Sequence, residues 1–402
     1  MARLRNLDDL LAQDLTGVGV FLRADLNLPR SGSKILDDTR MRATLPTLKA
    51  LSAAQARTLV FSHYGRPRGE RKAGLSLEPL TPPLSRLLDA EVSFAPECVG
   101  TVAAEAAANT PPGGYCLFEN LRFHAGEESN DPDFASALSS LAGAYINDAF
   151  GCSHRAHASI VGVAGRLERH AAGRLLISET AALQRLLERP EPPFVAVVGG
   201  AKIRSKIDTL RNLLSRLDTL LVGGAMANTL LAAQGHELGA SRVAEDELEL
   251  ARRLLADAEA RQVEVVLPTD LVVTDRPGEG READIKTVAV EDVGDGWMAV
   301  DLGESTLAEF DRALSKAGTV FWNGPVGLFE TPPFDHGSRH LACSLAASSA
   351  YTVVGGGETV AVVNQSGVAK AIDHVSTGGG AALDLLAGKA LPGVEVLIGG
   401  KV

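Results

Sequence analysis

Short apolar runs rich in β-branched residues alternate with amphipathic stretches along the whole 402-residue chain. We predict strands at 18–22, 57–61, 114–118 and 143–146 in the first half, and at 194–198, 219–222, 263–267, 319–322 and 351–354 in the second. Helical patterns lie between the strands, for example at 40–54, 79–89 and 132–141. Alternation of this kind predicts an α/β fold with parallel sheets, right-handed crossovers and covering helices.

The length indicates two domains, because 402 residues are too many for one hydrophobic core. Residues 174–189 have the pattern of one amphipathic helix, and the sequence PEPP at 190–193 stops it. A helix followed by a proline-rich stop is typical of a hinge. We therefore predict a hinge helix at about 174–190, with the second sheet beginning near Phe194.

The composition is that of a globular protein with mainly aliphatic cores. Apolar residues make up 45% of the chain, charged residues 22% and aromatic residues only 4%. Val, Leu, Ile and Ala must then supply most of the core, which suits buried parallel strands. The net charge of −11 argues against a nucleic-acid-binding protein, since affinity for a phosphate backbone requires a basic surface. Any anionic ligand must be held by a local basic cluster.

The cysteines and the first residues indicate a cytoplasmic protein. No CxxC is present, and the cysteines lie far apart, which favours free thiols in a reducing compartment: Cys98, Cys116, Cys152 and Cys343. The sequence MARLRNLDDL lacks the apolar core of a signal peptide. No run approaches the roughly 18 apolar residues of a membrane span. We expect no membrane partner.

Polar, charged or glycine-rich residues follow the predicted strands in both halves. In the first half they are Arg23, Asp25, Ser62, His63, Glu119 to Arg122, Asn147 and Asp148. In the second half they are 199–202, 223–224, 323–325 and 355–358. Ligands of open α/β sheets bind outside the carboxyl ends of the strands. We therefore predict two ligands, one on each half, that face each other across a cleft.

The strand ends of the first half are rich in arginine and histidine. The basic residues are Arg23, Arg40, His63, Arg66, Arg122, His154 and Arg155. A single arginine is more often a solvated surface charge, but several at strand ends of an acidic chain form a pattern. The guanidinium group offers a rigid fork of donors to phosphate and carboxylate oxygens. The pattern predicts a small ligand with several negative charges.

The strand ends of the second half are glycine loops at 199–206, 223–225 and 355–359. Glycine lets the backbone approach phosphates, and a following helix N-terminus favours negative charge. Each loop alone is weak evidence for a phosphate site, because a glycine after a strand often only forms a turn. Lys202 and Lys206 are one helical turn apart and are expected on the same side of a helix start. Together these features suit a nucleotide polyphosphate, although neither a Walker A motif nor GxGxxG is present.

The sequence has no recognisable nucleophile motif, and His154 with His157 lacks a third metal ligand. What remains is positioning and positive charge, which is most of what phosphoryl transfer needs. A carboxylate acceptor, with a pKa of roughly 4, is ionised at neutral pH and needs no general base. An alcohol acceptor would need one, for which Asp25 is the candidate. Both acceptors stay open at this point.

Nine motifs in a fixed order resemble those of phosphoglycerate kinases. They are FLRADLNLP (21–29), SHYGRP (62–67), FENLRF (118–123), NDAFGCSHRAHAS (147–159), VVGGAKIRSKI (197–207), GGAMANTLLAAQG (223–235), WNGPVGLFE (322–330), GGGET (355–359) and STGGGAALDLLAGKALPG (376–393). The resemblance spans nearly the whole chain and implies reversible phosphoryl transfer in glycolysis: 1,3-bisphosphoglycerate and ADP give 3-phosphoglycerate and ATP. An inactive relative that binds these ligands as a sensor is the alternative.

The resemblance also implies the architecture. Two Rossmann-like domains are expected, each a parallel sheet flanked by helices. The 3-phosphoglycerate domain would comprise 1–173 with 386–402, because the family's tail returns to the first domain. The domain that binds ATP or ADP with Mg²⁺ would comprise 174–385. The family expectation is a monomer.

Roles are carried over by motif position. The substrate residues are then Asp25, Leu26, Asn27, Arg40, His63, Tyr64, Gly65, Arg66, Arg122 and Arg155. Among these, Asp25 and Asn27 would bind the glycerate and Arg40 would face the transferring phosphoryl group. The nucleotide residues are Lys202, Lys206, Gly223, Gly224, Asn323, Pro325, Glu330, Gly356, Gly357, Glu358 and Thr359. The catalytic residues would be Arg40, Lys202, Lys206 and Gly357.

Four residues depart from the family pattern. Tyr64 replaces a leucine, Glu304 replaces a proline and is expected to loosen its loop, and Arg174 replaces an apolar residue. Glu358 stands where the family has the aspartate that binds Mg²⁺, and we assign the metal to it. The other interpretation is that Glu358 only stabilises the N-terminus of the next helix.

Overall fold

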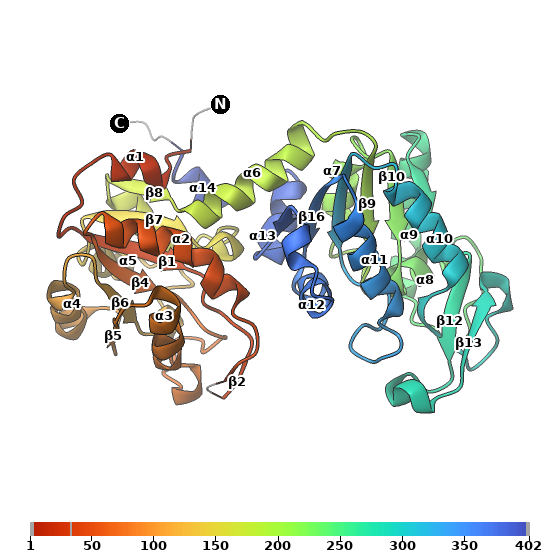
Figure 1. Cartoon of the computed structure of the whole chain (residues 1–402), viewed down its shortest axis with the longest axis horizontal. Helices are drawn as coiled ribbons and strands as arrows, with labels where there is room; N and C mark the ends of the chain where they lie inside the picture. The colour runs from red at the N-terminus through yellow and green to blue at the C-terminus, as the bar shows by residue number, and fades with distance from the viewer. Residues whose placement is uncertain (1–3, 33, 399–402) are drawn as a thin grey trace. The chain divides into compact units, whose positions relative to one another are not determined.

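The structure is a computed structural model that describes residues 4–32 and 34–398. Contacts divide the chain into two compact units. Unit 1 runs to Ala181 and includes the segment from Ala390 onwards, and unit 2 is Ala182–Lys389. Within the described residues, each unit holds a six-stranded parallel sheet flanked by helices (Figure 1). The predicted α/β fold with two parallel sheets is confirmed.

The sheet of unit 1 has the strand order β5-β6-β4-β1-β7-β8, and every neighbouring pair is parallel. The strands are β1 (Gly19–Ala24), β4 (Arg57–Phe61), β5 (Val92–Ala95), β6 (Tyr115–Phe118), β7 (Ala144–Asp148) and β8 (His170–Ala172). The helices are α1 (Leu7–Leu11), α2 (Thr39–Ala53), α3 (Thr81–Leu88), α4 (Gly100–Asn109), α5 (Pro132–Ser139) and α14 (Pro392–Glu395). A short antiparallel hairpin joins β2 (Arg30–Ser31) to β3 (Lys34–Ile35).

Aromatic residues contribute more to the core of unit 1 than the composition predicts. Phe118, Phe61, Phe21 and Tyr145 lie on the adjacent strands β6, β4, β1 and β7, and their rings stack in that order. All four side chains are nearly or fully buried. Because each aromatic pair stabilises by about 0.5–1.5 kcal/mol beyond its buried area, this ladder fixes the strand register under the site.

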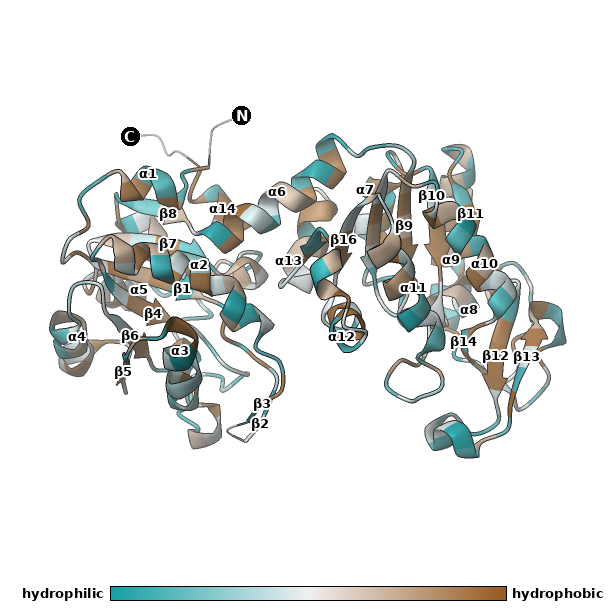
Figure 2. Ribbon diagram, in the orientation of Figure 1, coloured by the Kyte–Doolittle hydropathy of each residue, from teal (hydrophilic) through white to brown (hydrophobic). Residues whose placement is uncertain are grey.

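The sheet of unit 2 has the order β11-β10-β9-β15-β16-β17 and is also parallel. The strands are β9 (Phe194–Val198), β10 (Thr219–Val222), β11 (Glu264–Val266), β15 (Thr319–Asn323), β16 (Tyr351–Gly355) and β17 (His374–Val375). The helices are α7 (Ile207–Leu213), α8 (Gly224–Ala233), α9 (Leu248–Ala260), α10 (Glu304–Leu314), α11 (His336–Ala347), α12 (Gly357–Gln365) and α13 (Gly379–Leu386). Figure 2 shows apolar residues concentrated in the strands, as expected for sheets buried on both faces.

A second sheet in unit 2 was not predicted. It is antiparallel, with the order β13-β12-β14, and comprises β12 (Asp270–Thr274), β13 (Ile285–Ala289) and β14 (Met298–Leu302). The edge strand β13 is mostly exposed, so its sequence lacks the apolar run that marks a buried strand. The alternation of strands with helices also favours a parallel assignment, and the three-strand insertion interrupts that alternation.

Helix α6 (Arg174–Glu188) matches the predicted hinge helix, and the contact boundary at 181/182 falls inside it. The predicted boundaries stand at 173/174 and 385/386, so they lie eight and four residues before the contact boundaries. In unit 1, Gly393 N–H donates to the Ser153 carbonyl at 2.9 Å, which joins the final segment to the loop after β7. Residues 1–3 and 399–402 of the predicted first domain lie outside the described residues.

Two departures from the family pattern are explained by local structure. Glu304 is the first residue of α10, where a negative charge is favourable, so the expectation of a loosened loop is wrong. Its carboxylate lies 3.1 Å from His336 Nε2. Arg174 begins α6 and lies 3.6 Å from the Asp8 carboxylate. None of the helices in the described residues is long and apolar enough to cross a membrane.

Candidate active site

The predicted substrate residues of unit 1 follow four adjacent strands at their carboxyl ends. Asp25 comes directly after β1, His63 two residues after β4, Arg122 in a turn after β6 and Arg155 in the loop after β7. Because β6, β4, β1 and β7 are neighbours in the sheet, these residues gather along one edge. Arg66 lies in the same loop as His63 and is exposed. His154 and Arg155 are half-buried, and Arg155 Nε lies 3.2 Å from His154 Nε2.

Arg40 is anchored by the bend after β1 and is partly exposed. Its Nη1 lies 3.4 Å from Asp25 Oδ2 and donates to the Asn27 carbonyl at 3.0 Å. Asp25 also accepts the Asn27 N–H at 3.2 Å, which fixes the bend after β1. The Asp25 side chain is buried, whereas that of Arg40 is 32% exposed. Asp25 and the Asn27 carbonyl thus fix the orientation of a partly exposed guanidinium group.

Gly65, in the loop after β4, makes hydrogen bonds to the loop after β1 and to the turn after β6. Its N–H donates to Asn27 Oδ1 at 3.0 Å, and its carbonyl accepts from Arg122 Nη1 at 2.8 Å. The neighbouring Tyr64 carbonyl accepts from Asn120 Nδ2 at 2.7 Å. Gly65 has φ +64°, and a Cβ there would press on the Leu75 side chain, so glycine is required. Leu26 is buried beneath the loop.

A buried ionic network lies behind His63. Arg23 is 1% exposed and donates from Nε to Ser159 Oγ at 2.8 Å, while Ser159 Oγ donates to Glu127 Oε1 at 2.6 Å. Arg23 Nη2 lies 3.2 Å from His63 Nδ1. Arg23 therefore lies inside β1, and the expectation that it offers its charge to a ligand at the strand end is wrong. Burial and then the nearby arginines hold the pKa of His63 well below its usual range, so this imidazole is neutral.

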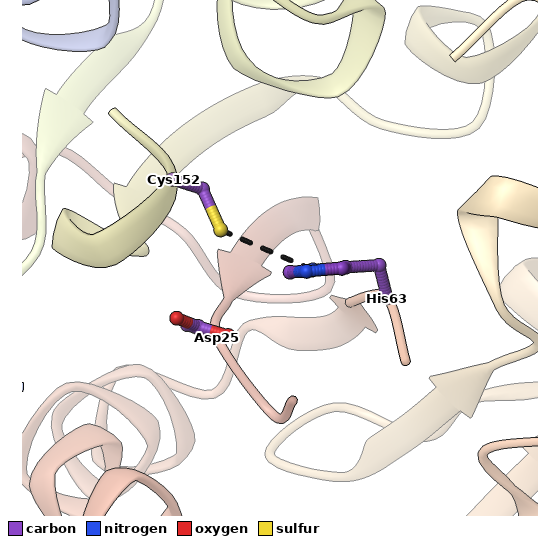
Figure 3. A group of neighbouring side chains, drawn as sticks. All are labelled: Asp25, His63 and Cys152. Carbon is purple, nitrogen blue, oxygen red and sulfur yellow. Dashed lines mark hydrogen bonds between the residues drawn. The ribbon is translucent and has the colours of Figure 1, made fainter. Parts of the chain in front are cut away.

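Asp25, His63 and Cys152 form the one group with a metal-type donor set among the described residues (Figure 3). Their ligand atoms lie within 4.8 Å of one another. Each atom, however, already faces a cation: Arg23 lies near the His63 nitrogen and 3.7 Å from Cys152 Sγ, and Arg40 pairs with Asp25. Burial raises the pKa of the Cys152 thiol to about 11. The surroundings thus favour an anion over a metal ion.

Lys206 is the central charged residue of the unit 2 site. Its Nζ donates to the carbonyls of Gly199 at 2.7 Å and Asn323 at 2.9 Å. Burial lowers the pKa of Lys206 to about 8, although the nearby Glu358 carboxylate raises it. Gly324 has φ +99°, and a Cβ there would collide with the Lys206 ammonium group. The glycine loops therefore make room for this lysine as well as for a ligand.

The structure corrects the expected position of the two lysines. Helix α7 begins at Ile207, so Lys206 is its N-cap residue and Lys202 lies in the preceding turn. The two side chains therefore do not share a helical face. Lys202 is exposed, while Lys206 is partly buried. The sequence spacing alone could not show that the helix begins five residues after Lys202.

A cavity of about 690 Å³ opens beside these loops within unit 2. Apolar side chains line much of it, including Leu271, Met298, Val300, Val326 and Phe329. Polar side chains are fewer. The lining includes several residues that the sequence predicted for this site: Gly200, Gly224, Pro325, Glu330 and Glu358. A mostly apolar hollow with a few polar groups is typical of a small-molecule site.

The predicted phosphate loops meet at the ends of β15 and β16. Thr359 Oγ1 is buried and accepts the Gly324 N–H at 2.7 Å, which ties the loop after β15 to α12. Gly356 is the N-cap residue of α12, followed by Gly357 and Glu358 in its first turn. Asn323 is 3% exposed, and its Nδ2 has no hydrogen-bond partner in the described part of the chain. Gly223 is the N-cap residue of α8 and packs on Val326.

Several residues of these sites were missed from the sequence. Glu127 and Ser159 complete the buried network. Glu127 lies in a turn, and Ser159 lies in the short helical segment Ala158–Gly162, where the motif at 147–159 gave it no role. Asn228, Arg242 and Met298 line the cavity, and Met298 belongs to the strand β14 that was not predicted. The apolar residues 297–300 were the available signal for that strand, although Asp301 interrupts the run before Leu302.

Unit 1 has arginines at one sheet edge, and unit 2 has a partly buried lysine among glycine loops, and both arrangements suit anionic ligands. This combination defines a kinase, a transferase of phosphoryl groups. The family model described as phosphoglycerate kinase matches residues 7–389. The chain belongs to the phosphoglycerate kinase family, and its reaction is the phosphoryl transfer of glycolysis.

Curated relatives and solved structures agree with this family. The chain is 52% identical over 386 residues to a phosphoglycerate kinase of Desulforudis audaxviator, covering 96% of this chain and 97% of the relative. It is 48% identical to that of Moorella thermoacetica, with 99% of both chains covered. The solved phosphoglycerate kinase of Coxiella burnetii has a TM-score of 0.87 and 37% identity, and the match covers 98% of this chain and 99% of that one.

Proposed function

We propose that the basic edge of unit 1 binds 3-phosphoglycerate or 1,3-bisphosphoglycerate, and that the cavity of unit 2 binds ATP or ADP. The observation that carries the proposal is the position of Lys206, whose ammonium group lies between glycine loops beside a cavity of about 690 Å³. A phosphate chain in those loops would bring its oxygens to this ammonium, while the apolar part of the cavity takes the base.

On the substrate side, the network of unit 1 supports a division of roles. Asp25 and the Asn27 side chain lie on the bend after β1 and would bind the glycerate. Arg66, Arg122 and Arg155 supply positive charge for the phosphate and carboxylate groups. Arg40 has a partly exposed side chain, directed by Asp25, whose guanidinium group would face the phosphoryl group in transfer. The acceptor carboxylate is ionised at neutral pH, so no residue has to act as a base.

Asp25 is a poor candidate for the base that an alcohol acceptor would require. Its carboxylate is buried, pairs with Arg40 at 3.4 Å and accepts the Asn27 N–H. Each oxygen therefore has one partner in the loop, and its remaining lone pair can accept from a glycerate hydroxyl without taking up a proton. This observation favours the carboxylate acceptor over the alcohol acceptor.

On the nucleotide side, Lys206 and Asn323 have the donors that a phosphate chain needs. The unpaired Asn323 Nδ2 is buried next to Gly356, at the N-terminus of α12. A phosphate oxygen at that point would satisfy it, and the first N–H groups of α12 would add to the binding. Glu330 lies on the cavity wall and would accept from the ribose hydroxyls.

The family's divalent cation has a suitable donor in this chain. Glu358 is exposed on the cavity lining and close enough to Lys206 to affect its pKa. One carboxylate together with phosphate oxygens and waters is a common ligand set for Mg²⁺, so Glu358 would hold the ion. When bound, Mg²⁺ would neutralise charge on the phosphate chain.

Transfer requires the two ligands to come within bonding distance. We therefore propose that the units approach one another during the reaction, with α6 and residues 376–393 as the segments that adjust. Small-angle scattering should give a smaller radius of gyration with both ligands bound than with either one. An identical radius in all states would contradict this step.

The activity is tested by a coupled assay that follows NADH oxidation while 3-phosphoglycerate and MgATP are supplied. Turnover with both substrates, and none when either is left out, is the expected result. Binding of both ligands without turnover would indicate the sensor alternative, and turnover with an alcohol acceptor would indicate the other kinase. A monomeric state, a cytoplasmic location and the absence of nucleic-acid or membrane partners stay predictions.

A further inference from the structure

The buried network behind His63 is not explained by ligand binding alone. Arg23, Ser159 and Glu127 are each at most 1% exposed, so none of them presents a group to a ligand in solution. Burying a charged pair costs several kcal/mol per ion unless hydrogen bonds satisfy it, as they do here. The network lies directly under His63, which is 4% exposed at the carboxyl end of β4.

The direction of each hydrogen bond in this network follows from elementary chemistry. Glu127 accepts the Ser159 N–H at 3.0 Å and the Ser159 hydroxyl at 2.6 Å. Since that hydroxyl has one hydrogen, its lone pairs accept from Arg23 Nε at 2.8 Å. A guanidinium group has donors and no acceptor, so at the 3.2 Å contact Arg23 Nη2 must donate to His63 Nδ1.

A neutral imidazole that accepts at Nδ1 carries its proton on Nε2. We propose that Arg23, held by Ser159 and Glu127, is a positioning residue that fixes His63 in its Nε2–H tautomer. His63 then donates one hydrogen bond through Nε2 to an oxygen of the substrate. The proposal rests on the proposed function, because the substrate of unit 1 is taken to be 3-phosphoglycerate.

The charges around His63 support a neutral donor. The groups that face it are Arg23, Arg122, Arg155, His157, Cys152 and Asp25. Burial, followed by the charges of Arg122 and Arg23, lowers the pKa of the neighbouring His157 to about 4. Although burial acts to lower the pKa of Arg23, the nearby acidic groups raise it above its ordinary value, so Arg23 stays charged. A cationic His63 would face several arginines at once.

A neutral donor also serves specificity. The arginines of the edge attract any small anion, since charge acts without regard to direction. An imidazole N–H with a fixed tautomer has one direction, and it is fixed before the substrate arrives. Fixing the tautomer removes the cost of selecting it at each binding event.

The experiment uses the full-length protein labelled with ¹⁵N-histidine and measures the two ring-nitrogen shifts of His63, assigned by comparison with His63→Gln. In the tautomer with the proton on Nε2, the unprotonated Nδ1 resonates far downfield of Nε2. The ligand-free wild type should show this pattern unchanged from pH 6 to 8. A wild-type His63 with its proton on Nδ1, or a doubly protonated ring at pH 7, would overturn the proposal.

Variants then test whether Arg23 sets the tautomer. Ser159→Ala removes the Oγ that holds Arg23, and Arg23→Lys keeps the charge but loses the planar fork. Both should populate the Nδ1–H form and raise the KM for 3-phosphoglycerate by about tenfold, the scale of one hydrogen bond to a charged group, with kcat changed less than about twofold. Tyr145→Phe is the matched control, because its buried hydroxyl donates to the Ser159 carbonyl and lies outside the network.

Loss of a buried charge can prevent folding, so a double variant is needed. Arg23→Met with Glu127→Gln removes both charges together and leaves no unpaired ion. It should fold, show a mixture of His63 tautomers and give a higher His63 pKa. An unchanged tautomer in all three variants would overturn the proposal. If the wild type has the expected tautomer but 3-phosphoglycerate leaves the His63 signals unmoved, the substrate assignment fails and the role of Arg23 stands.

Discussion

The two sites are built from different parts of the polypeptide. In unit 1 the ligand edge is made of side chains, and two of them are held by charged neighbours: Asp25 directs Arg40, and Arg23 contacts the neutral His63. In unit 2 the edge is made mainly of backbone, with glycine loops, two helix N-termini and one partly buried lysine. A side-chain site discriminates among small anions by geometry, whereas a backbone site accepts any phosphate chain that fits.

The comparison is tested most severely by Arg40→Ala. If the Arg40 guanidinium group stabilises the phosphoryl group during transfer, this variant should lower kcat on the order of 10³-fold or more, the scale for an arginine that acts in the transition state. The KM for 3-phosphoglycerate should change far less, because Arg66, Arg122 and Arg155 still attract the ground-state anion. Steady-state kinetics in the coupled assay give both values.

Arg42→Ala is the matched control for this variant. Arg42 lies two residues further along α2 and pairs with Asp38 on an exposed surface, so its loss should leave the kinetics unchanged. An Arg40→Ala enzyme with normal kcat and a raised KM would mean that Arg40 only binds substrate.

The second test concerns the lysine of the backbone site. The pKa of Lys206 is about 8 because burial disfavours its charge. The charged form is present below that pH and is lost above it, so kcat/KM for ATP should fall about tenfold for each pH unit above 8. Lys206→Arg, which does not titrate in this range, should lose activity at pH 7 but show no such fall. A wild-type profile flat to pH 9.5 would contradict the assignment.

The third test asks whether the backbone site needs one acidic side chain. Glu358→Ala should raise the Mg²⁺ concentration for half-maximal rate by about tenfold, and Glu358→Asp should keep most of the activity. Glu249→Ala is the control, because Glu249 is likewise an exposed acid in the first turn of a helix. An unchanged Mg²⁺ requirement with a lower Tm would favour the capping role.

The contrast between the sites also explains what the sequence predicts well. Strand ends and their polar residues can be predicted because a buried parallel strand is a compact apolar run, and β4, β9 and β10 match their predicted bounds. Motif order then carries roles to Arg40, Lys206 and Glu330. These local patterns predict the candidate residues of both sites but do not give their hydrogen bonds.

Long-range partners could not be predicted in the same way. Ser159 lies 136 positions after Arg23, and nothing in either local sequence indicates their hydrogen bond. The expected helical spacing of Lys202 and Lys206 failed because the start of α7 depends on the fold around Lys206. The antiparallel sheet was missed because its edge strand is exposed and has no apolar pattern.

The smallest expected effect concerns a feature that the two units share. Each buries an aspartate at the end of a strand, where it accepts N–H groups at the start of a helix: Asp148 from Leu175 of α6, and Asp301 from Gly337 of α11. Burial raises the pKa of each carboxyl group from 3.8 to about 7. Between those values the folded state keeps a proton that the unfolded state has released. The free energy of unfolding should therefore fall as the pH rises from 4 to 7 and then level off.

Asp148→Asn and Asp301→Asn should each remove part of that slope. The Tm of either variant, relative to the wild type, should rise by about 2–4 °C between pH 6 and pH 8, equivalent to about 1 kcal/mol, because one pH unit of that slope lies below the raised pKa. The activities separate the two units, because Asp301 lines the nucleotide cavity and Asp148 lies in unit 1 beneath α6. Asp301→Asn should therefore raise the KM for ATP several-fold, the scale of one hydrogen bond, while Asp148→Asn leaves that KM unchanged. Differential scanning calorimetry at three pH values measures the first effect, and a relative Tm independent of pH would show that neither carboxyl group titrates with folding.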